Sequence, residues 1–222
     1  MENKYSNIIL YSYWRSSCSY RVRIALNLKN IKYDIKPINL LKSEQTSDEY
    51  IEKNPLRRIP CLELELKNIN GKTERVFIKE SISICEFLEE IYPETNLLPH
   101  DPIAKAQVRS IMSHIASNIH PIQNLMVMKR IEEIGYSKLE WAKEWITKGL
   151  EDLEKILIET KGKYCFNDTI TLADAFLIPQ LYNARRFDVD LEKFPIISEI
   201  EANLKDVDAF RLAAPENQLD KV

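Results

Sequence analysis

The chain has 222 residues, of which 45% are hydrophobic, so it is long enough to bury a core in one large domain or two small ones. Lys and Arg number 31 against 34 Asp and Glu, and this net charge of −3 excludes a general nucleic-acid binder and a polybasic membrane anchor. No apolar run is long enough to span a bilayer and the first residues lack a signal-peptide pattern, so we expect a cytoplasmic protein without a membrane partner.

Cysteine and histidine spacing gives no indication of a disulfide framework or a metal site. The four cysteines are Cys18, Cys61, Cys85 and Cys165, and none forms a C-x-x-C pair. This scatter fits a reducing compartment. The three histidines are not spaced as metal ligands, so we expect no metal.

The chain up to Ile91 alternates between strand and helix patterns. The predicted elements are a strand at 8–10, a helical stripe at 22–28, a strand at 33–38, a short helix at 47–53, strands at 61–66 and 75–78 joined by an Asn70-Gly71 turn, and a helix over 82–91 capped by Ser81. Basic Arg21, Arg23 and Lys29 are expected around the first helical stripe. The βαβαββα order predicts a thioredoxin-like domain with a parallel strand pair and a hairpin.

A semi-rigid linker follows, because residues 92–102 contain three prolines. Beyond it the hydrophobic period is helical throughout, with apolar stripes at 108–119, 141–157 and 196–204 and a capping box at Thr171-Leu172-Ala173-Asp174. We therefore predict an α/β domain over 1–92, a linker over 93–102 and an all-α domain over 103–222.

The turn between the first strand and the first helix is the strongest candidate for a site. Ser16, Ser17 and Ser19 are residue types that cap helices, and capping alone explains them simply. The first turn of a helix also presents unpaired N–H groups and a partial positive charge, which stabilise a bound anion. A thiolate is the anion that we expect there.

The stretch Ser16–Leu26 resembles the S-S-C-[SA]-x-R-V-R-I-A-L signature of zeta-class glutathione transferases, the maleylacetoacetate isomerases. The resemblance continues in order through almost the whole chain, at residues 33–40, 54–60, 80–81, 97–102, 121–125, 171–174 and 179–187. It implies a glutathione transferase-like architecture, a homodimer and glutathione as cofactor. The implied activity is cis–trans isomerisation of maleylacetoacetate to fumarylacetoacetate in tyrosine and phenylalanine catabolism, with transferase activity on small α-halo acids.

Ser16 is the residue expected to donate a hydrogen bond to the glutathione thiolate, with Ser17 and Cys18 as catalytic partners. A free thiol has a pKa of ~8.5. For the thiolate to dominate at pH 7, it must be stabilised relative to the thiol by about 2 to 3.4 kcal/mol. A helix N-terminus supplies roughly 0.3–1 kcal/mol, or about 2 when partly buried. A hydrogen bond to a charged group adds about 1.5–3 kcal/mol, so neither effect is clearly sufficient alone, whereas the two together are.

The resemblance implies further ligand contacts. The cofactor-binding residues would be Ser16, Ser17, Cys18, Ser19, Tyr20, Arg21, Gln45, Ile59, Glu80, Ser81, His120, Asn124, Leu125 and Met126. Glu80 and Ser81 would hold the γ-glutamyl end, Gln45 the glycyl carboxylate, and Ile59 the peptide backbone beside a cis Pro60. Arg186 and Arg15 would bind the carboxylates of a dicarboxylate substrate. Glu80 and His120 stand where the family often has glutamine.

Two other functions remain open at this stage. Cys18 could be the nucleophile of a thiol transferase or dehydroascorbate reductase that works through one thiol. Arg21 occupies the position where a C-x-x-C enzyme has its second cysteine, which excludes an intramolecular disulfide. The second alternative is a non-catalytic glutathione transferase-like interaction domain, of the kind attached to translation factors.

Overall fold

The computed structural model describes residues 4–67, 70 and 72–221, which form two compact units. The first unit contains the chain up to Asn96 together with the segment from Asp208 onward. The second unit is Leu97–Val207.

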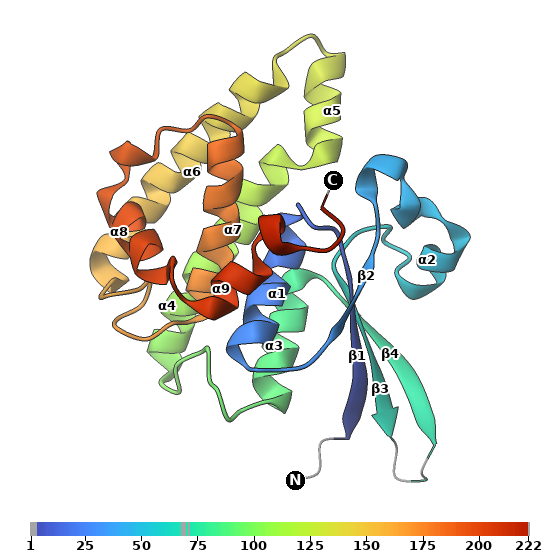
Figure 1. Ribbon diagram of the computed structural model, residues 1–222. Helices are drawn as coiled ribbons and strands as arrows, with labels where there is room; N and C mark the ends of the chain where they lie inside the picture. The colour runs from blue at the N-terminus through green and yellow to red at the C-terminus, as the bar shows by residue number, and fades with distance from the viewer. Residues whose placement is uncertain (1–3, 68–69, 71, 222) are drawn as a thin grey trace. The chain divides into compact units, whose positions relative to one another are not determined.

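The first unit is built on a four-stranded mixed sheet with the order β2-β1-β3-β4 (Figure 1). Its strands are β1 (Tyr5–Ser12), β2 (Asp34–Pro37), β3 (Cys61–Lys67) and β4 (Thr73–Lys79). β1 pairs in parallel with β2 and antiparallel with β3, and β4 pairs antiparallel with β3. The predicted parallel pair and antiparallel hairpin are confirmed, although Gly71 of the expected turn lies outside the described residues.

Helices cover both faces of this sheet. Helices α1 (Ser17–Leu28) and α3 (Ser81–Ile91) pack on one face, and the short helix α2 (Asp48–Lys53) lies on the other (Figure 1). Leu62 and Leu64 of β3 are completely buried beneath the first pair. Cys61, on the opposite face, packs with Tyr11 and with Tyr50 of α2. Two short 3-10 helices, η1 (Leu40–Lys42) and η2 (Glu44–Thr46), lead into α2.

The start of α3 differs from the prediction. Glu80 is the N-cap, in an unusual backbone conformation (φ 67°, ψ 126°), and Ser81 is the first helical residue. The prediction that Ser81 caps this helix was therefore wrong, because its hydroxyl instead accepts a hydrogen bond from Arg21.

The C-terminal segment belongs to the first unit. Helix α9 (Asp208–Ala213) and the 3-10 helix η6 (Pro215–Asn217) pack there, and Phe210 and Ala213 are buried. The compact units thus differ from the predicted domains, in which the helical domain extends to residue 222. Helix α9 is too short for its periodicity to show which surface it covers.

The second unit is entirely helical. Its elements are α4 (Pro102–Ser113), the π-helix η3 (His114–Ile119), η4 (His120–Gln123), α5 (Leu125–Glu133), α6 (Lys138–Thr160), α7 (Leu172–Arg186), η5 (Leu191–Lys193) and α8 (Pro195–Leu204). The capping box of Thr171 and Asp174 is confirmed at the start of α7. The stripe at 108–119 is not one regular helix, because it changes from α to π at His114. Within the described residues, no helix has both the length and the apolar character needed to cross a membrane.

Candidate active site

The turn from β1 into α1 places Ser16 at the helix N-cap. Its Oγ accepts a hydrogen bond from the Ser19 N–H at 3.2 Å, and its backbone is extended (φ −73°, ψ 119°). Because the oxygen is the acceptor in this bond, the hydroxyl proton remains available to donate. Ser16 is half-buried. One side chain can therefore cap the helix and also donate to an anion at the same point.

A buried guanidinium lies below this turn. Arg21 is only 1% exposed, and its Nη1 lies 3.8 Å from Cys18 Sγ and 3.3 Å from Ser81 Oγ. Burial lowers the pKa of Arg21, while the neighbouring Cys18 and Cys85 oppose that shift. A guanidinium remains protonated near neutral pH even after such a shift. Arg21 therefore places a positive charge between the start of α1 and the start of α3.

The start of α3 has a strained residue at its N-cap and no capping hydrogen bond from that residue's side chain. Glu80 makes no side-chain capping bond, and its positive φ is a conformation that non-glycine residues adopt at a cost of roughly 1–3 kcal/mol. The carboxylate is thus not used for capping, and the helix N–H groups beside Ser81 are suited to an anion. The Glu80 carboxylate is therefore suited to accept from an ammonium group, and the helix N–H groups next to it are suited to bind a carboxylate.

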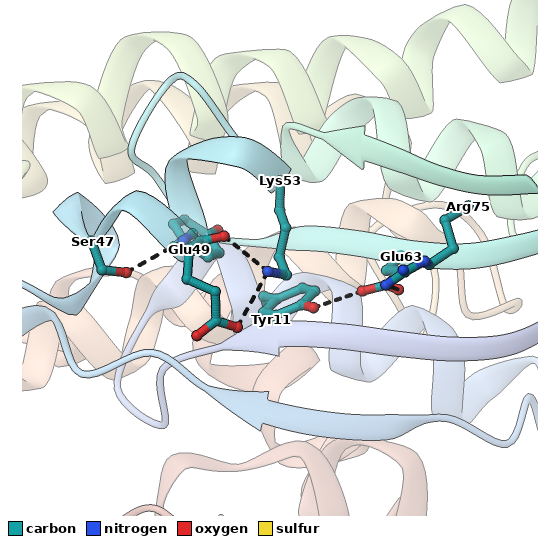
Figure 2. Close-up of polar contacts among 7 residues, drawn as sticks. Tyr11, Ser47, Glu49, Lys53, Glu63 and Arg75 are labelled. Atoms are coloured by element: carbon teal, nitrogen blue, oxygen red, sulfur yellow. Dashed lines mark hydrogen bonds and ion pairs between the residues drawn. The ribbon is translucent and has the colours of Figure 1, made fainter.

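Polar contacts on the opposite face of the sheet lie between the strands and within α2. Tyr11 donates to the buried Glu63 at 2.6 Å, and Arg75 lies 3.7 Å from the same carboxylate (Figure 2). Lys53 pairs with Glu49 within α2 at 3.3 Å (Figure 2). Lys53 therefore belongs to an ion pair on α2.

The segment after α2 presents the residues expected to contact a peptide. The Ile59-Pro60 bond is cis, as the resemblance implied. Tyr50 and Asn54 both donate to the Arg58 carbonyl, at 2.6 and 2.7 Å, and so fix the backbone directly before Ile59. Gln45 lies in η2, and its buried Oε1 has no hydrogen-bond partner among the described residues.

Ser19 and Tyr20 face the interior of the first unit. Ser19 is fully buried, and the Tyr20 hydroxyl donates to the Phe210 carbonyl at 3.4 Å. This burial indicates packing roles for both side chains. Ser17 is also buried, whereas Cys18 is half-buried. Arg15 is half-buried, with its guanidinium 5.3 Å from the centre of the Trp14 ring.

The remaining expected contacts lie in the second unit. His120 begins η4, and Asn124 caps α5 by accepting from the Met126 N–H at 3.1 Å. Leu125 and Met126 are exposed. The structure thus brings residues 120–126 together as one continuous segment leading into α5.

Arg186 ends α7, and its exposed guanidinium bonds to Asn183 at 3.0 Å. Its neighbour Arg185 is paired with Glu201, and this pairing raises the pKa of Arg185. Arg185 is exposed. Among the described residues, no three His, Cys, Asp or Glu side chains come together as a metal-binding group.

Arg23 and Asp220 lie beside the turn and were not among the site residues predicted from the sequence. Arg23 was expected around the helical stripe, but it is completely buried. Its position within the apolar run from Val22 to Leu26 was an available signal. No local pattern could have indicated Asp220, because its partner Trp14 lies 206 positions earlier in the chain.

Comparison with known proteins agrees with this geometry. The family model for the glutathione S-transferase N-terminal domain matches residues 15–91. A probable maleylacetoacetate isomerase 2 from Drosophila melanogaster is 50% identical over 214 residues, covering 96% of this chain and 89% of that protein. The maleylacetoacetate isomerase of Mus musculus is 45% identical over 214 residues, covering 96% of this chain and 94% of that protein.

A solved structure is similar over the full length. The crystal structure of maleylacetoacetate isomerase from Anaeromyxobacter dehalogenans 2CP-1, with bound GSH in the active site, superposes with a TM-score of 0.88 at 37% identity. The match covers 99% of this chain and 100% of that one. The fold and the serine turn are those of a glutathione transferase. Within that group, the chain belongs to the zeta class, the family of the maleylacetoacetate isomerases.

Proposed function

We propose that this protein is a glutathione-dependent isomerase that converts maleylacetoacetate to fumarylacetoacetate, a step of tyrosine and phenylalanine catabolism. The observation that carries the proposal is the half-buried Ser16 hydroxyl at the N-terminus of α1. The chain covers most of the length of relatives that are named maleylacetoacetate isomerases.

The residues of the first unit fit glutathione. When bound, glutathione supplies a thiolate that adds reversibly to the activated double bond, so that rotation about a single bond becomes possible before the thiolate leaves. Ser16 would donate its hydroxyl proton to that sulfur, and the N–H groups at the start of α1 would add their partial positive charge. Ser17 and Cys18 would border the same sulfur.

The other contacts follow the chemistry of the tripeptide. Glu80 would accept from the γ-glutamyl ammonium, and Ser81 with the first N–H groups of α3 would hold the adjacent carboxylate. The Ile59 backbone would pair with the cysteinyl residue, and Gln45 would donate to the glycyl carboxylate. Arg21 supports both ends of this arrangement through Cys18 and Ser81.

Residues 120–126 and the two arginines complete the proposal. His120, Asn124, Leu125 and Met126 would contact glutathione or the substrate. Arg186 and Arg15 would bind the substrate carboxylates as planar cations. We further propose activity on small α-halo acids, a cytoplasmic location and a homodimer.

The test is a direct assay. Purified protein with glutathione should isomerise maleylacetoacetate or maleylacetone, followed by ultraviolet absorbance, and dichloroacetate should compete. Ultraviolet titration of bound glutathione should show a thiol pKa well below ~8.5. A bound thiol that ionises as it does in buffer, together with absence of turnover, would refute the proposal.

One observation supports a second function. Cys18 is half-buried and lies near the Arg21 guanidinium, so it could form a mixed disulfide as part of thiol transfer. Treatment with glutathione disulfide followed by mass spectrometry tests this directly. An unmodified Cys18 excludes thiol transfer through this residue and leaves the isomerase proposal intact.

A further inference from the structure

The last residues of the chain contact the turn that carries Ser16. We name residues 208–221 the C-terminal strap. Its backbone accepts hydrogen bonds from three side chains of α1. Tyr20 donates to the Phe210 carbonyl at 3.4 Å, Asn27 donates to the Ala209 carbonyl at 3.1 Å, and Arg23 is the third. The strap is thus fastened along α1 before it reaches the turn.

Arg23 joins the strap to the turn. Its guanidinium donates to the Ala213 carbonyl at 2.9 Å, the Ser12 hydroxyl at 3.0 Å, the Tyr13 carbonyl at 3.4 Å and the Trp14 carbonyl at 3.0 Å. Arg23 is completely buried, and burial lowers its pKa to about 10, so it remains a cation near neutral pH. A buried arginine without a directly bonded carboxylate is costly, and packing alone would be served better by an apolar residue.

Asp220 is the strap residue that binds the turn through its side chain. Its Oδ2 accepts from the Trp14 N–H at 2.9 Å, so the carbonyl and the N–H of Trp14 are both held by side chains from outside the turn. Gln218 holds the strap backbone two residues before Asp220, because its amide donates to the carbonyls of Leu212 and Ala214 at 2.9 and 3.0 Å.

The geometry of the turn explains why this matters for Ser16. The Ser16 N–H donates to the Tyr13 carbonyl at 2.9 Å, so Ser16 follows any movement of the backbone at Tyr13 and Trp14. A hydroxyl that must donate to a thiolate has to be held to within about 0.5 Å and 10–20° of its productive geometry. The strap therefore sits where it can set that geometry.

We propose that Asp220 and Arg23 are positioning residues, and that the C-terminal strap holds the β1–α1 turn in the geometry that lets Ser16 act on the glutathione sulfur. This inference rests on the proposed function of Ser16. It assigns a functional role to a segment that lies far from the serines in sequence.

The experiment compares Asp220→Ala with Glu216→Ala. Both substitutions remove one carboxylate from the strap, but Glu216 is exposed in η6 and forms no hydrogen bond or ion pair with the turn among the described residues. Asp220→Ala should raise the pKa of the bound glutathione thiol and lower kcat about tenfold, with a change of less than about twofold in the Kd of glutathione. Glu216→Ala should match the wild type in all three quantities.

Two further variants separate positioning from folding. Asp220→Asn keeps an oxygen acceptor for the Trp14 N–H and should restore most of kcat. A chain ending at Gln218 should behave like Asp220→Ala, and thermal melts show that each assay is run on folded protein. Asp220→Ala with wild-type thiol pKa and kcat would overturn the inference while the wild-type activity leaves the proposed function standing. A wild type that neither binds nor ionises glutathione would refute the proposed function, and the inference with it.

Discussion

In the proposed function, one serine at the start of α1 has two roles, which the sequence alone presents as alternatives. The Ser16 oxygen accepts from the Ser19 N–H, so it is a helix cap, and the same hydroxyl keeps its proton for an outside acceptor. In the proposed function, cap formation and activation of a thiol thus reinforce each other, because both require the hydroxyl at the N-terminal end of α1.

Ser16→Ala should lower kcat by roughly 10²-fold, the effect expected when a preorganised donor worth about 2.7 kcal/mol is removed. It should also lower the free energy of unfolding by about 1 kcal/mol through loss of the cap. Ser16→Thr keeps the hydroxyl and serves as the matched control. Steady-state kinetics and thermal melts measure both effects, and unchanged turnover in Ser16→Ala would remove this serine from the mechanism.

Arg21 is the second residue whose role is testable alone. Its Nη1 contacts both Cys18 Sγ and Ser81 Oγ, so Arg21→Met removes one cation and two contacts from the starts of two helices. We expect glutathione affinity to fall at least about tenfold, because a hydrogen bond to a charged group is worth about 1.5–3 kcal/mol. Calorimetric titration measures the change. Arg185→Met, at an exposed arginine of the second unit, is the control and should bind glutathione normally.

At the scale of elements, the sequence predicted what local periodicity determines. Strand β3, predicted from its alternating apolar residues, is present, and so is the predicted capping box at the start of α7. The start of α3 was assigned one residue late, because a strained Glu80 at the cap contradicts intrinsic preference. Helix α5 was not predicted, since it begins with the exposed apolar pair Leu125 and Met126 and so lacks a clear polar face at its start.

The candidate site was likewise predictable only where it is formed by residues close together in sequence. The serine turn could be predicted because its residues are contiguous, and the resemblance to the family signature predicted its chemistry. The contacts of Arg21 with Ser81 and of Asp220 with Trp14 connect residues 60 and 206 positions apart. Local patterns contain no information about such pairs, because tertiary packing alone brings them together.

The π-helix η3 shows how one element depends on a glycine of another. A Cβ at Gly149 of α6 would lie 2.5 Å from Ile119 Cγ1, and the Gly149 carbonyl lies 2.9 Å from His114 Nε2. The absence of a side chain at Gly149 therefore permits the close approach of η3 to α6. Since η3 leads directly into residues 120–126, this contact also sets the position of that segment.

Gly149→Ala should destabilise the protein despite the higher helix propensity of alanine. The propensity gain is about 1 kcal/mol, whereas overpacking costs typically about 1–3 kcal/mol, so we expect a net loss of up to about 2 kcal/mol. Chemical denaturation measures the free energy of unfolding. Ile119→Ala removes Cγ1 and Cδ1, the two atoms that the new methyl group would approach most closely, so adding Gly149→Ala to that variant should cost little further. Additive losses in the double variant would contradict this account.

On the scale of the whole molecule, the first unit is assembled from both ends of the chain, and the second unit is inserted in sequence between Asn96 and Asp208. Folding of the first unit therefore requires contacts that span most of the chain. The C-terminal strap is consequently part of the same unit as the serine turn, and truncation at the C-terminus is expected to affect the turn rather than the helical unit alone.

The protein as a whole should lose stability at alkaline pH. Burial raises the pKa of Cys61 and of Cys85 to about 12, and it raises the pKa of Cys165 as well. In the unfolded chain these three cysteine thiols ionise near pH 9, so the folded state binds more protons than the unfolded state between about pH 9 and 12. The stability that comes from burying each neutral thiol is complete below pH 9 and is lost as the pH rises through 12.

For Cys85 alone this linkage predicts a loss of about 1.4 kcal/mol between pH 8 and pH 10. Cys85→Ala should therefore flatten the fall of unfolding free energy over that interval by about that amount, even though the substitution itself destabilises the core at pH 8. Ile84→Val, at the neighbouring buried position, lowers stability without removing a titrating group and should leave the pH dependence unchanged. Urea denaturation at the two pH values measures the difference, and parallel curves for Cys85→Ala and the wild type would show that the buried thiol does not drive the alkaline transition.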